Sequence, residues 1–493
     1  MIRTAIPAAP PYDRTRVTPG IVHFGVGNFH RSHQAMYLDR LLRRGRAADW
    51  GILGVGLLPR DAAMGEALRA QACVYTLVEL AADGTRTATR IGSIVDFLHA
   101  PSAPGAVREA LASPGIRIAS LTITEGGYNT SDTTGAFDTE NPDVLADVGA
   151  EFPRTVFGVL AAGLRLRRER GIPPFTIASC DNILGNGDVT RAALVAFARL
   201  AYDDEFADWI ANDVAFPNSM VDRITPVTGD AERALVRGSF GIDDLCPVVC
   251  EPFTQWVIED DFPLGRPAWE EVGAQLVDDV APYELMKLRL LNGSHQAIAY
   301  AGLLGGHTFV HEAIGDPAVT DLVERYMDEA VTTLQPVEGI DLRAYRTELL
   351  QRFGNPHIRD TLERLATDAS DRIPKFVVPV ASRRGVEGIG SPAAAEVVAD
   401  WAARSRAVLR AGGALNDRQA ARMADALRRA DAKPARFLDE TDWFGSLRDD
   451  PLFVADFERL SRTRGWGTGH EEAGPGTQHP TRPPSPSAHG VPG

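Results

Sequence analysis

The densest group of side chains that could do chemistry lies at residues 284–296, in the run Glu-Leu-Met-Lys-Leu-Arg-Leu-Leu-Asn-Gly-Ser-His-Gln. On a helix that turns about 100° per residue, Lys287, Asn292 and His295 fall within one arc of about 140°. A lysine buried on such an apolar helix would have a lowered pKa and could act as a general base. Asn292 could donate to an oxygen that gains negative charge, His295 could bind a hydroxyl, and Gly293 would let a ligand approach. A surface lysine and a satisfied core histidine are the alternatives for single residues, but the three together favour catalysis.

A glycine turn near the N-terminus could hold a dinucleotide. The apolar run 21–24 predicts a buried strand, and apolar residues at helical spacing predict a helix over 32–44. Between them, Gly25 would permit the tight turn, and Gly27 would allow a pyrophosphate to come close to the backbone N–H groups. His30 stands where the third glycine of this fingerprint is usual, so an ordinary strand-to-helix turn is the alternative.

An acidic residue after the second strand would bind the ribose of such a dinucleotide. Asp61 follows the apolar run 50–57 and fits this role, although it could instead cap the helix that begins at the next residue. Arg60 beside it could accommodate a 2′-phosphate, so the sequence leaves NAD and NADP both open.

Further polar residues follow the expected strands. Glu125 follows the strand run 118–124, and Asp181 and Asn182 follow the run 175–179. Ligands of parallel sheets bind at the carboxyl ends of strands, but Asp and Asn are also turn formers, which the sequence alone favours for this pair.

Two weaker groups stand on expected helices. Arg364 and Lys375 could reach a substrate or could lie on solvated faces. His307 and His311 have the i, i+4 spacing of helical metal ligands, but no third ligand is obvious, and we therefore expect no metal site.

Strand-like runs alternate with helical runs up to about residue 280, which predicts an α/β fold with an open, mostly parallel sheet. Helical patterns dominate after that point. We therefore expect a Rossmann-type dinucleotide-binding domain at 1–286, a mainly α-helical C-terminal domain at 287–466, and a disordered Pro- and Gly-rich tail at 467–493.

The composition narrows the classes of function. The chain has 493 residues, with 51 basic and 66 acidic side chains and a formal net charge of −15. This excess of negative charge disfavours nucleic-acid and anionic-membrane partners. The sequence contains neither a signal peptide nor an apolar stretch of about 18 residues, so we expect a cytoplasmic protein.

Four blocks of sequence together resemble one known family, the polyol-specific long-chain dehydrogenases. They are Ile-Val-His-Phe-Gly-Val-Gly-Asn-Phe-His-Arg at 21–31, Thr-Ile-Thr-Glu-Gly-Gly-Tyr at 122–128, Ser-Cys-Asp-Asn at 179–182, and Lys, Asn and His at 287, 292 and 295. The resemblance runs from about residue 20 to about residue 460. The glycine block and the lysine block in combination are highly specific.

The resemblance implies a Rossmann-type domain, a helical domain, and between them an active site that oxidises a secondary alcohol with NAD and without a metal. Lys287 would be the general base, and Asn182 and Asn292 would hold the reacting oxygen. His295 would orient the hydroxyl, and Glu284 would lie on the proton path. The residues then expected to bind the cofactor are Val22, Gly25, Val26, Gly27, Asn28, Phe29, His30, Arg31, Asp61 and Glu125, and those expected to bind the substrate are Asp222, Arg364 and Lys375.

The substrate that this resemblance favours is a sugar alcohol, with the oxidation of D-mannitol to D-fructose as the first choice, and we expect a monomer. A reductase of the same family that acts on a hexuronate such as fructuronate is the alternative enzyme, and Arg364 would then bind the carboxylate. A non-catalytic nucleotide-binding module is the alternative of another class, which the intact Lys287, Asn292 and His295 disfavour.

Overall fold

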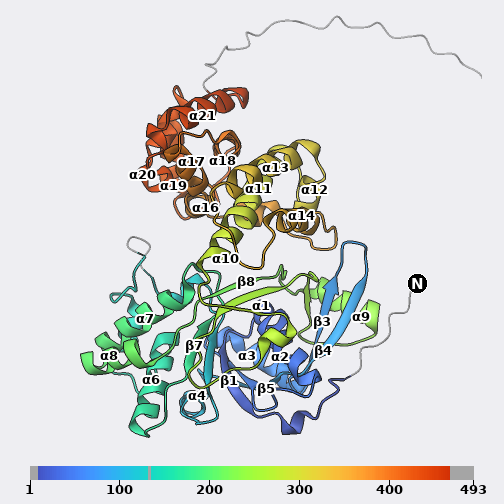
Figure 1. Ribbon diagram of the computed structural model, residues 1–493, viewed down its shortest axis with the longest axis vertical. Coiled ribbons are helices and arrows are strands. Elements are labelled where there is room, and N and C mark those ends of the chain that lie inside the picture. The colour runs from blue at the N-terminus through green and yellow to red at the C-terminus, as the bar shows by residue number, and fades with distance from the viewer. Residues whose placement is uncertain (1–8, 131–134, 467–493) are drawn as a thin grey trace, which may run out of the picture.

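The computed structural model describes residues 9–130 and 135–466 of the chain. The sheets and helices of the N-terminal half lie together, and the helices of the C-terminal half form a second body above them (Figure 1). The chain passes from one to the other at α10 (Ala281–Met286). The tail expected at 467–493 lies outside the described residues.

The main sheet of the N-terminal half has five parallel strands in the order β5-β2-β1-β6-β7. Their bounds are β1 (Pro19–Phe24), β2 (Gly51–Gly56), β5 (Ile94–His99), β6 (Ile118–Leu121) and β7 (Thr176–Ser179). The short, β-branched apolar runs form buried strands because helices cover both faces of the sheet. The strand order reverses beside β1, and in open α/β sheets this is where ligands bind. The expected Rossmann-type architecture is thereby confirmed.

Helices cover this sheet on two sides (Figure 1). Ile21 packs in one apolar cluster with Leu38 and Leu68, and the next residue, Val22, packs in the opposite cluster with Leu160 and Leu194. The first face is covered by α2 (Gln34–Arg43) and α3 (Ala62–Ala70); the second is covered by α4 (Pro104–Leu111), α6 (Val156–Glu169), α7 (Asn186–Ala201) and α8 (Asp204–Asp213).

The helix expected over 32–44 is α2, at 34–43. A short helix, α1 (Asn28–Ser32), precedes it and ends at His33, whose φ of −118° and ψ of −95° are not helical. The buried ring of His33 contacts the carbonyl of Gln255, at 2.9 Å. Strand β3 (Tyr75–Leu80) lies outside the main parallel sheet, because an Asp83-Gly84 turn folds it into a hairpin.

Two small sheets complete the N-terminal half. One has the order β4-β3-β9, and the other has the order β11-β10-β8. Their further strands are β4 (Arg86–Ile91), β9 (Val248–Cys250), β8 (Ser219–Asp222), β10 (Gln255–Glu259) and β11 (Gln275–Val277), and the remaining helices of this half are α5 (Pro142–Asp147) and α9 (Asp230–Phe240).

The C-terminal half is helical, as expected. Its central helix, α11 (Gly293–Leu304), packs with its neighbours around a core that includes Tyr326, Trp401 and Phe437. The other helices are α12 (Val310–Ala313), α13 (Pro317–Val331), α14 (Leu342–Phe353), α15 (Leu362–Ala366), α16 (Ala369–Phe376), α17 (Val378–Val386), α18 (Pro392–Arg410), α19 (Ala420–Arg429), α20 (Thr441–Phe444) and α21 (Pro451–Thr463). The Asp-Pro pairs before α13 and α21 start these helices, because the aspartate side chain caps the first N–H groups.

The crossing into the helical half is one continuous run. A π-helix (Lys287–Asn292) joins α10 directly to α11. A domain boundary drawn between residues 286 and 287 would therefore fall inside a helix. Among the described residues, no helix is long and apolar enough to cross a membrane.

Candidate active site

Lys287 lies where the helical half meets the carboxyl ends of the N-terminal strands. Its Nζ donates to Asn182 Oδ1 at 2.5 Å, just after β7, and to the carbonyl of Val221 on β8 at 2.6 Å. The residue is 7 % exposed. The cavity beside it is lined by three segments of the chain: residues 181–184, residues 219–221, and Glu284 with Lys287 and Leu288.

Burial lowers the pKa of Lys287. Asp222 and Glu284 act in the opposite direction, because each carboxylate favours the ammonium form, whereas the cation of Arg352 adds to the lowering. The sequence predicted a buried lysine with a lowered pKa, and the structure has this arrangement. A lysine that loses its proton more readily is suited to general-base catalysis.

The helix that carries Lys287 is not the regular α-helix assumed from the spacing. Residues 287–292 form a π-helix, in which the N–H of Gly293 donates to the carbonyl of Leu288, five residues back. A turn bonded i to i+5 brings Asn292 nearer to the side of the helix on which Lys287 lies than the arc of about 140° expected for an α-helix. Such wide turns are rare and are frequent at functional sites.

Asn292 and His295 present polar groups with no protein partner. Neither side chain has a hydrogen bond to any other described residue, although Asn292 is only 9 % exposed. Burial lowers the pKa of His295 to about 4, so the imidazole is neutral, and its ring lies 4.8 Å from that of Phe353. Unpaired polar groups of largely buried side chains favour binding of a ligand with hydroxyl groups.

The interpretation of Gly293 is wrong. A Cβ at this position would lie 2.0 Å from Tyr326 Oη, so the glycine is required for close packing of α11 against α13. It does not make room for a ligand.

Glu284 lies one turn before Lys287 at the wall of the same cavity. Its carboxylate accepts from the N–H of Gly185 at 3.1 Å. Burial raises the pKa of Glu284 to about 7, so this carboxyl can both take up and release a proton near neutral pH.

Asp181 has a role that the sequence left open between turn former and ligand. Its buried carboxylate accepts from the N–H groups of Ile123 and Thr124, at 3.1 and 2.8 Å, and from the hydroxyl of Tyr128 at 2.9 Å. Thr124 has a φ of +61°, which is strained for a residue other than glycine. Asp181 therefore holds the loop that carries the exposed Glu125.

The glycine turn leaves space for a bound group to lie close to its backbone. Gly25 has a φ of +90°, and a Cβ there would lie 2.1 Å from the carbonyl of Thr122. At Gly27, by contrast, only Gly25 O comes within 4 Å of the added Cβ. The backbone at Gly27 is thus open to a close-lying group, which fits a pyrophosphate. Asn28 Nδ2 donates to the carbonyl of Pro226, and Phe29 is half-buried beside the turn.

Three of the residues expected to bind the cofactor lie beneath this turn. Val22 and His30 are fully buried, and the ring of His30 stacks on His23 with centroids 3.4 Å apart. Arg31 is 1 % exposed and donates to the carbonyl of Cys246 and to Asn28 Oδ1. Their side chains support the turn from inside the fold, whereas Val26 is 6 % exposed at the turn itself.

Asp61 lies just beyond the carboxyl end of β2. Its carboxylate accepts from the N–H of Leu58 at 2.9 Å and does not cap α3, so the capping alternative is not observed. Arg60 beside it is exposed. The position fits a ribose-binding carboxylate.

The three residues expected to bind substrate differ in their surroundings. Asp222 is buried next to Lys287 and is paired with Arg352, at 2.7 Å. Arg364 is paired with Asp360, at 2.6 Å from Nε to Oδ1. Lys375 is 57 % exposed and paired with Asp371, so the structure does not bring it into this cluster.

Sequence reasoning missed Arg352 and Glu251. Arg352 Nη2 lies 2.8 Å from Glu251 Oε1, and the two residues are 101 positions apart in the chain. No local pattern in the sequence joins them.

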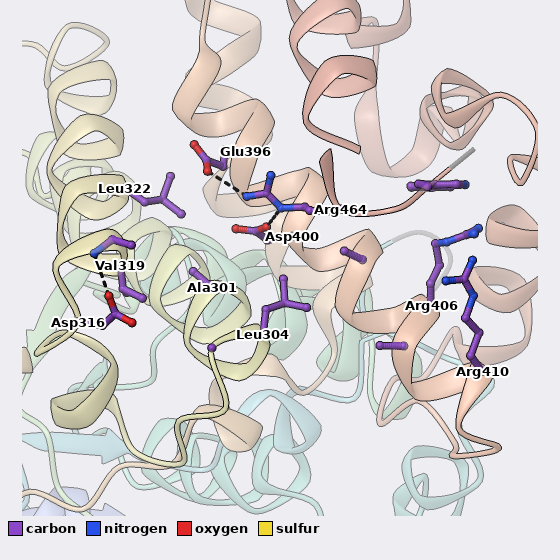
Figure 2. A pocket seen from close by; sticks show the side chains of 15 residues that line it. Ala301, Leu304, Asp316, Val319, Leu322, Glu396, Asp400, Arg406, Arg410 and Arg464 are labelled. Carbon is purple, nitrogen blue, oxygen red and sulfur yellow. Dashed lines mark hydrogen bonds and ion pairs between the residues drawn. The ribbon is translucent and has the colours of Figure 1, made fainter. Parts of the chain in front are cut away.

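A larger cavity, of about 440 Å³, lies within the helical half between α11, α13 and α18 (Figure 2). Three of its charged residues pair with one another, since Arg464 contacts both Asp400 and Glu396. It contains none of the residues described above. Within the described ranges, no three His, Cys, Asp or Glu side chains are grouped to hold a metal, and His307 contacts Asp316 instead.

Comparisons with known proteins agree with this geometry. The family model for the mannitol dehydrogenase Rossmann domain matches residues 19–271, and that for the mannitol dehydrogenase C-terminal domain matches residues 279–462. The chain belongs to the mannitol dehydrogenase family. It is a polyol dehydrogenase, and the resemblance noted from the sequence is confirmed.

Individual relatives are similar over nearly the whole chain. Mannitol 2-dehydrogenase of Cereibacter sphaeroides is 46 % identical over 452 residues, which are 91 % of this chain and 94 % of the relative. The solved ternary complex of Pseudomonas fluorescens mannitol 2-dehydrogenase with NAD and D-mannitol is 45 % identical with a TM-score of 0.82, covering 93 % of this chain and 94 % of that one. A D-sorbitol dehydrogenase solved in substrate-free form is 37 % identical with a TM-score of 0.85, covering 93 % and 96 %.

Proposed function

We propose that this protein oxidises the C2 hydroxyl of a sugar alcohol, D-mannitol before others, to the ketone, with NAD as the cofactor and Lys287 as the general base. The observation that carries the proposal is the buried Nζ of Lys287, held between Asn182 Oδ1 and the carbonyl of Val221. The same continuous helical run carries the unpaired side chains of Asn292 and His295. A solved relative 45 % identical to this chain holds NAD and D-mannitol.

The residues present fit the cofactor. The open backbone at Gly27 suits the pyrophosphate, and Asp61 suits the two hydroxyls of an unphosphorylated ribose. Bound NAD supplies the acceptor for the hydride that leaves the carbinol carbon. Arg60 beside Asp61 leaves room for some use of NADP.

The proton chemistry follows from the hydrogen bonds of the site. Asn182 Oδ1 is occupied by Lys287, which leaves the Nδ2 group of Asn182 to donate to the reacting oxygen. The amide of Asn292 is free to do the same. Neutral Lys287 accepts the hydroxyl proton while the two amides stabilise the alkoxide that develops. The neutral imidazole of His295 orients the hydroxyl.

Glu284 can transfer the proton from Lys287 to water. Its pKa of about 7 and its place on the wall of the Lys287 cavity allow it to receive a proton from the ammonium and release it to water. The substrate thus loses a hydride and a proton, and the product is the ketose with one reduced cofactor.

The choice of a polyol over a uronate is supported by Arg364. Its guanidinium is paired with Asp360, so a substrate carboxylate would have to displace that carboxylate first. D-sorbitol is a second candidate polyol, because a D-sorbitol dehydrogenase has a very similar fold. The acidic net charge of −15 supports an absence of nucleic-acid partners, and a mass near 53.2 kDa in light scattering would support the expected monomer.

Product analysis tests the proposal. Incubation of the purified protein with NAD⁺ and D-mannitol should form D-fructose and NADH in equal amounts. Turnover of fructuronate with NADH, and of no polyol, would overturn the choice of substrate.

A further inference from the structure

A buried ion-pair cluster of Arg352, Asp222 and Glu251 lies next to Lys287. Arg352 Nη1 donates to Asp222 Oδ2 at 2.7 Å, and its Nε and Nη2 donate to the two carboxylate oxygens of Glu251 at 2.9 and 2.8 Å. The three residues are 8 %, 6 % and 2 % exposed, and the guanidinium carbon lies 3.8 Å from the centre of the Phe253 ring. Each of the three guanidinium nitrogens therefore donates to a carboxylate of the cluster.

The cluster joins the two halves of the molecule at the site. Arg352 belongs to α14 of the helical half, whereas Asp222 ends β8 and Glu251 follows β9 of the N-terminal half. Asp222 directly follows Val221, whose carbonyl accepts from Lys287 Nζ. Arg352 thus fixes the strand end against which the lysine rests.

The charges of the cluster bear on the proton of Lys287. The charged and titratable groups that face Lys287 are Asp222 on β8, Arg352 on α14, Glu284 on α10 and His33 between α1 and α2; His295 on α11 also faces Asp222. Two carboxylates and one guanidinium give the cluster a net charge of −1. Without the guanidinium, the carboxylate of Asp222 would lie uncompensated and buried near the amine, with that of Glu251 beyond it next to Asp222, and both would favour the ammonium form.

We propose that Arg352 is a positioning residue of the reaction, which offsets the negative charge of Asp222 and Glu251 so that Lys287 can release its proton near neutral pH. The inference rests on the proposed role of Lys287 as the base. Arg352 does not touch the substrate in this account; it acts through Asp222 and the strand end at Val221.

The pH dependence of kcat/KM for polyol oxidation tests this role with three variants. Arg352→Met should raise the apparent pKa of the rising limb by at least about one unit, which is a tenfold loss of rate at pH values below that limb. Arg352→Lys keeps the positive charge and should shift the limb much less, even if it weakens the protein. Glu251→Gln removes one carboxylate and should shift the limb in the opposite direction, to lower pH.

A matched control separates this effect from simple loss of stability. Arg167 is also fully buried, and its guanidinium donates to backbone carbonyls, among them those of Leu111 and Ile116, far from Lys287. Arg167→Met should lower Tm and leave the pH profile in place. Equal profiles for Arg352→Met, Arg352→Lys and wild type, or a shift in the same direction for Arg352→Met and Glu251→Gln, would overturn the proposal.

A second readout does not depend on turnover. The chain contains only three lysines, Lys287, Lys375 and Lys433, so the acetylation of each by acetic anhydride can be followed against pH by peptide mass spectrometry. In Arg352→Met, the midpoint for Lys287 should move to higher pH while those of Lys375 and Lys433 stay in place. If the wild type turns over no polyol, the proposed function fails, yet this measurement still decides the role of Arg352; an unmoved Lys287 midpoint would contradict it.

Discussion

Replacement of Lys287 by alanine removes the proposed base while leaving its surroundings nearly intact. The variant loses the two hydrogen bonds from Nζ, to Asn182 Oδ1 and to the carbonyl of Val221. Asn182 is exposed and can bind water instead, so the buried carbonyl of Val221 is the one group left unpaired. An unpaired buried carbonyl costs about 1–3 kcal/mol of stability. Removal of the buried amine, whose charged form is disfavoured by burial, offsets part of this cost, so the fold should persist.

The catalytic loss should be much larger than the loss of stability. A positioned general base contributes about 10²- to 10⁴-fold in rate, which corresponds to about 2.7–5.4 kcal/mol in the activation free energy. We therefore expect kcat of Lys287→Ala to fall by at least about a hundredfold, with KM for NAD little changed because the glycine turn is untouched. Small primary amines added to the buffer should restore part of the rate.

The same lysine determines whether the rate of the wild type rises or falls with pH. Oxidation requires the neutral amine, so its rate should rise with pH through the lowered pKa of Lys287. Ketose reduction requires the ammonium as proton donor and should fall across the same range. The assay is the initial rate of NADH formation or consumption from acid to alkaline pH, with Lys433→Ala as the control because that lysine is exposed in the helical half.

Retention of more than a tenth of wild-type kcat by Lys287→Ala would refute the reasoning.

Three further outcomes follow from neighbouring residues. Asp181→Asn removes a carboxylate that three donors share, so it should loosen the loop bearing Glu125 and raise KM for NAD roughly fivefold or more in steady-state kinetics; an unchanged KM would contradict the role of Asp181. Asp61→Ala should raise KM for NAD more than KM for NADP, and an equal effect on both would remove Asp61 from the ribose site. Glu284 has a pKa raised to about 7 in the fold, so its contribution to stability is lost as pH rises through that value. The free energy of unfolding of Glu284→Gln should therefore exceed that of wild type by about 2 kcal/mol at pH 8 and by little at pH 4, as measured by urea unfolding.

Much of the site could be predicted because its signals are local in the sequence. The strand at 21–24 and the glycines after it form one continuous turn, and the conformation of Gly25 needs no distant partner to be inferred. The lysine, asparagine and histidine stand within nine residues on an apolar helix, so their side chains had to share one region.

The parts that were missed depend on distant contacts. Nothing in the types of residues 287–292 distinguishes a π-helix from an α-helix. The clamp of Arg352 on Asp222 and Glu251 joins segments more than 100 residues apart. The role of Asp181 could not be separated from that of a turn former until the loop at 123–128 was placed beside it. The burial of His30 and Arg31 beneath the glycine turn could not be predicted either, because Arg31 donates to the carbonyl of the distant Cys246.

The measurement that tests the central claim most directly is a set of initial rates on the purified protein in the presence of a metal chelator. NAD⁺ and NADP⁺ would each be paired with D-mannitol, D-sorbitol and D-arabinitol, and NADH with D-fructose and D-fructuronate. The account predicts chelator-resistant oxidation of D-mannitol with NAD⁺ preferred, and reduction of D-fructose in the reverse direction. Activity that the chelator abolishes, or activity confined to the uronate, would contradict it.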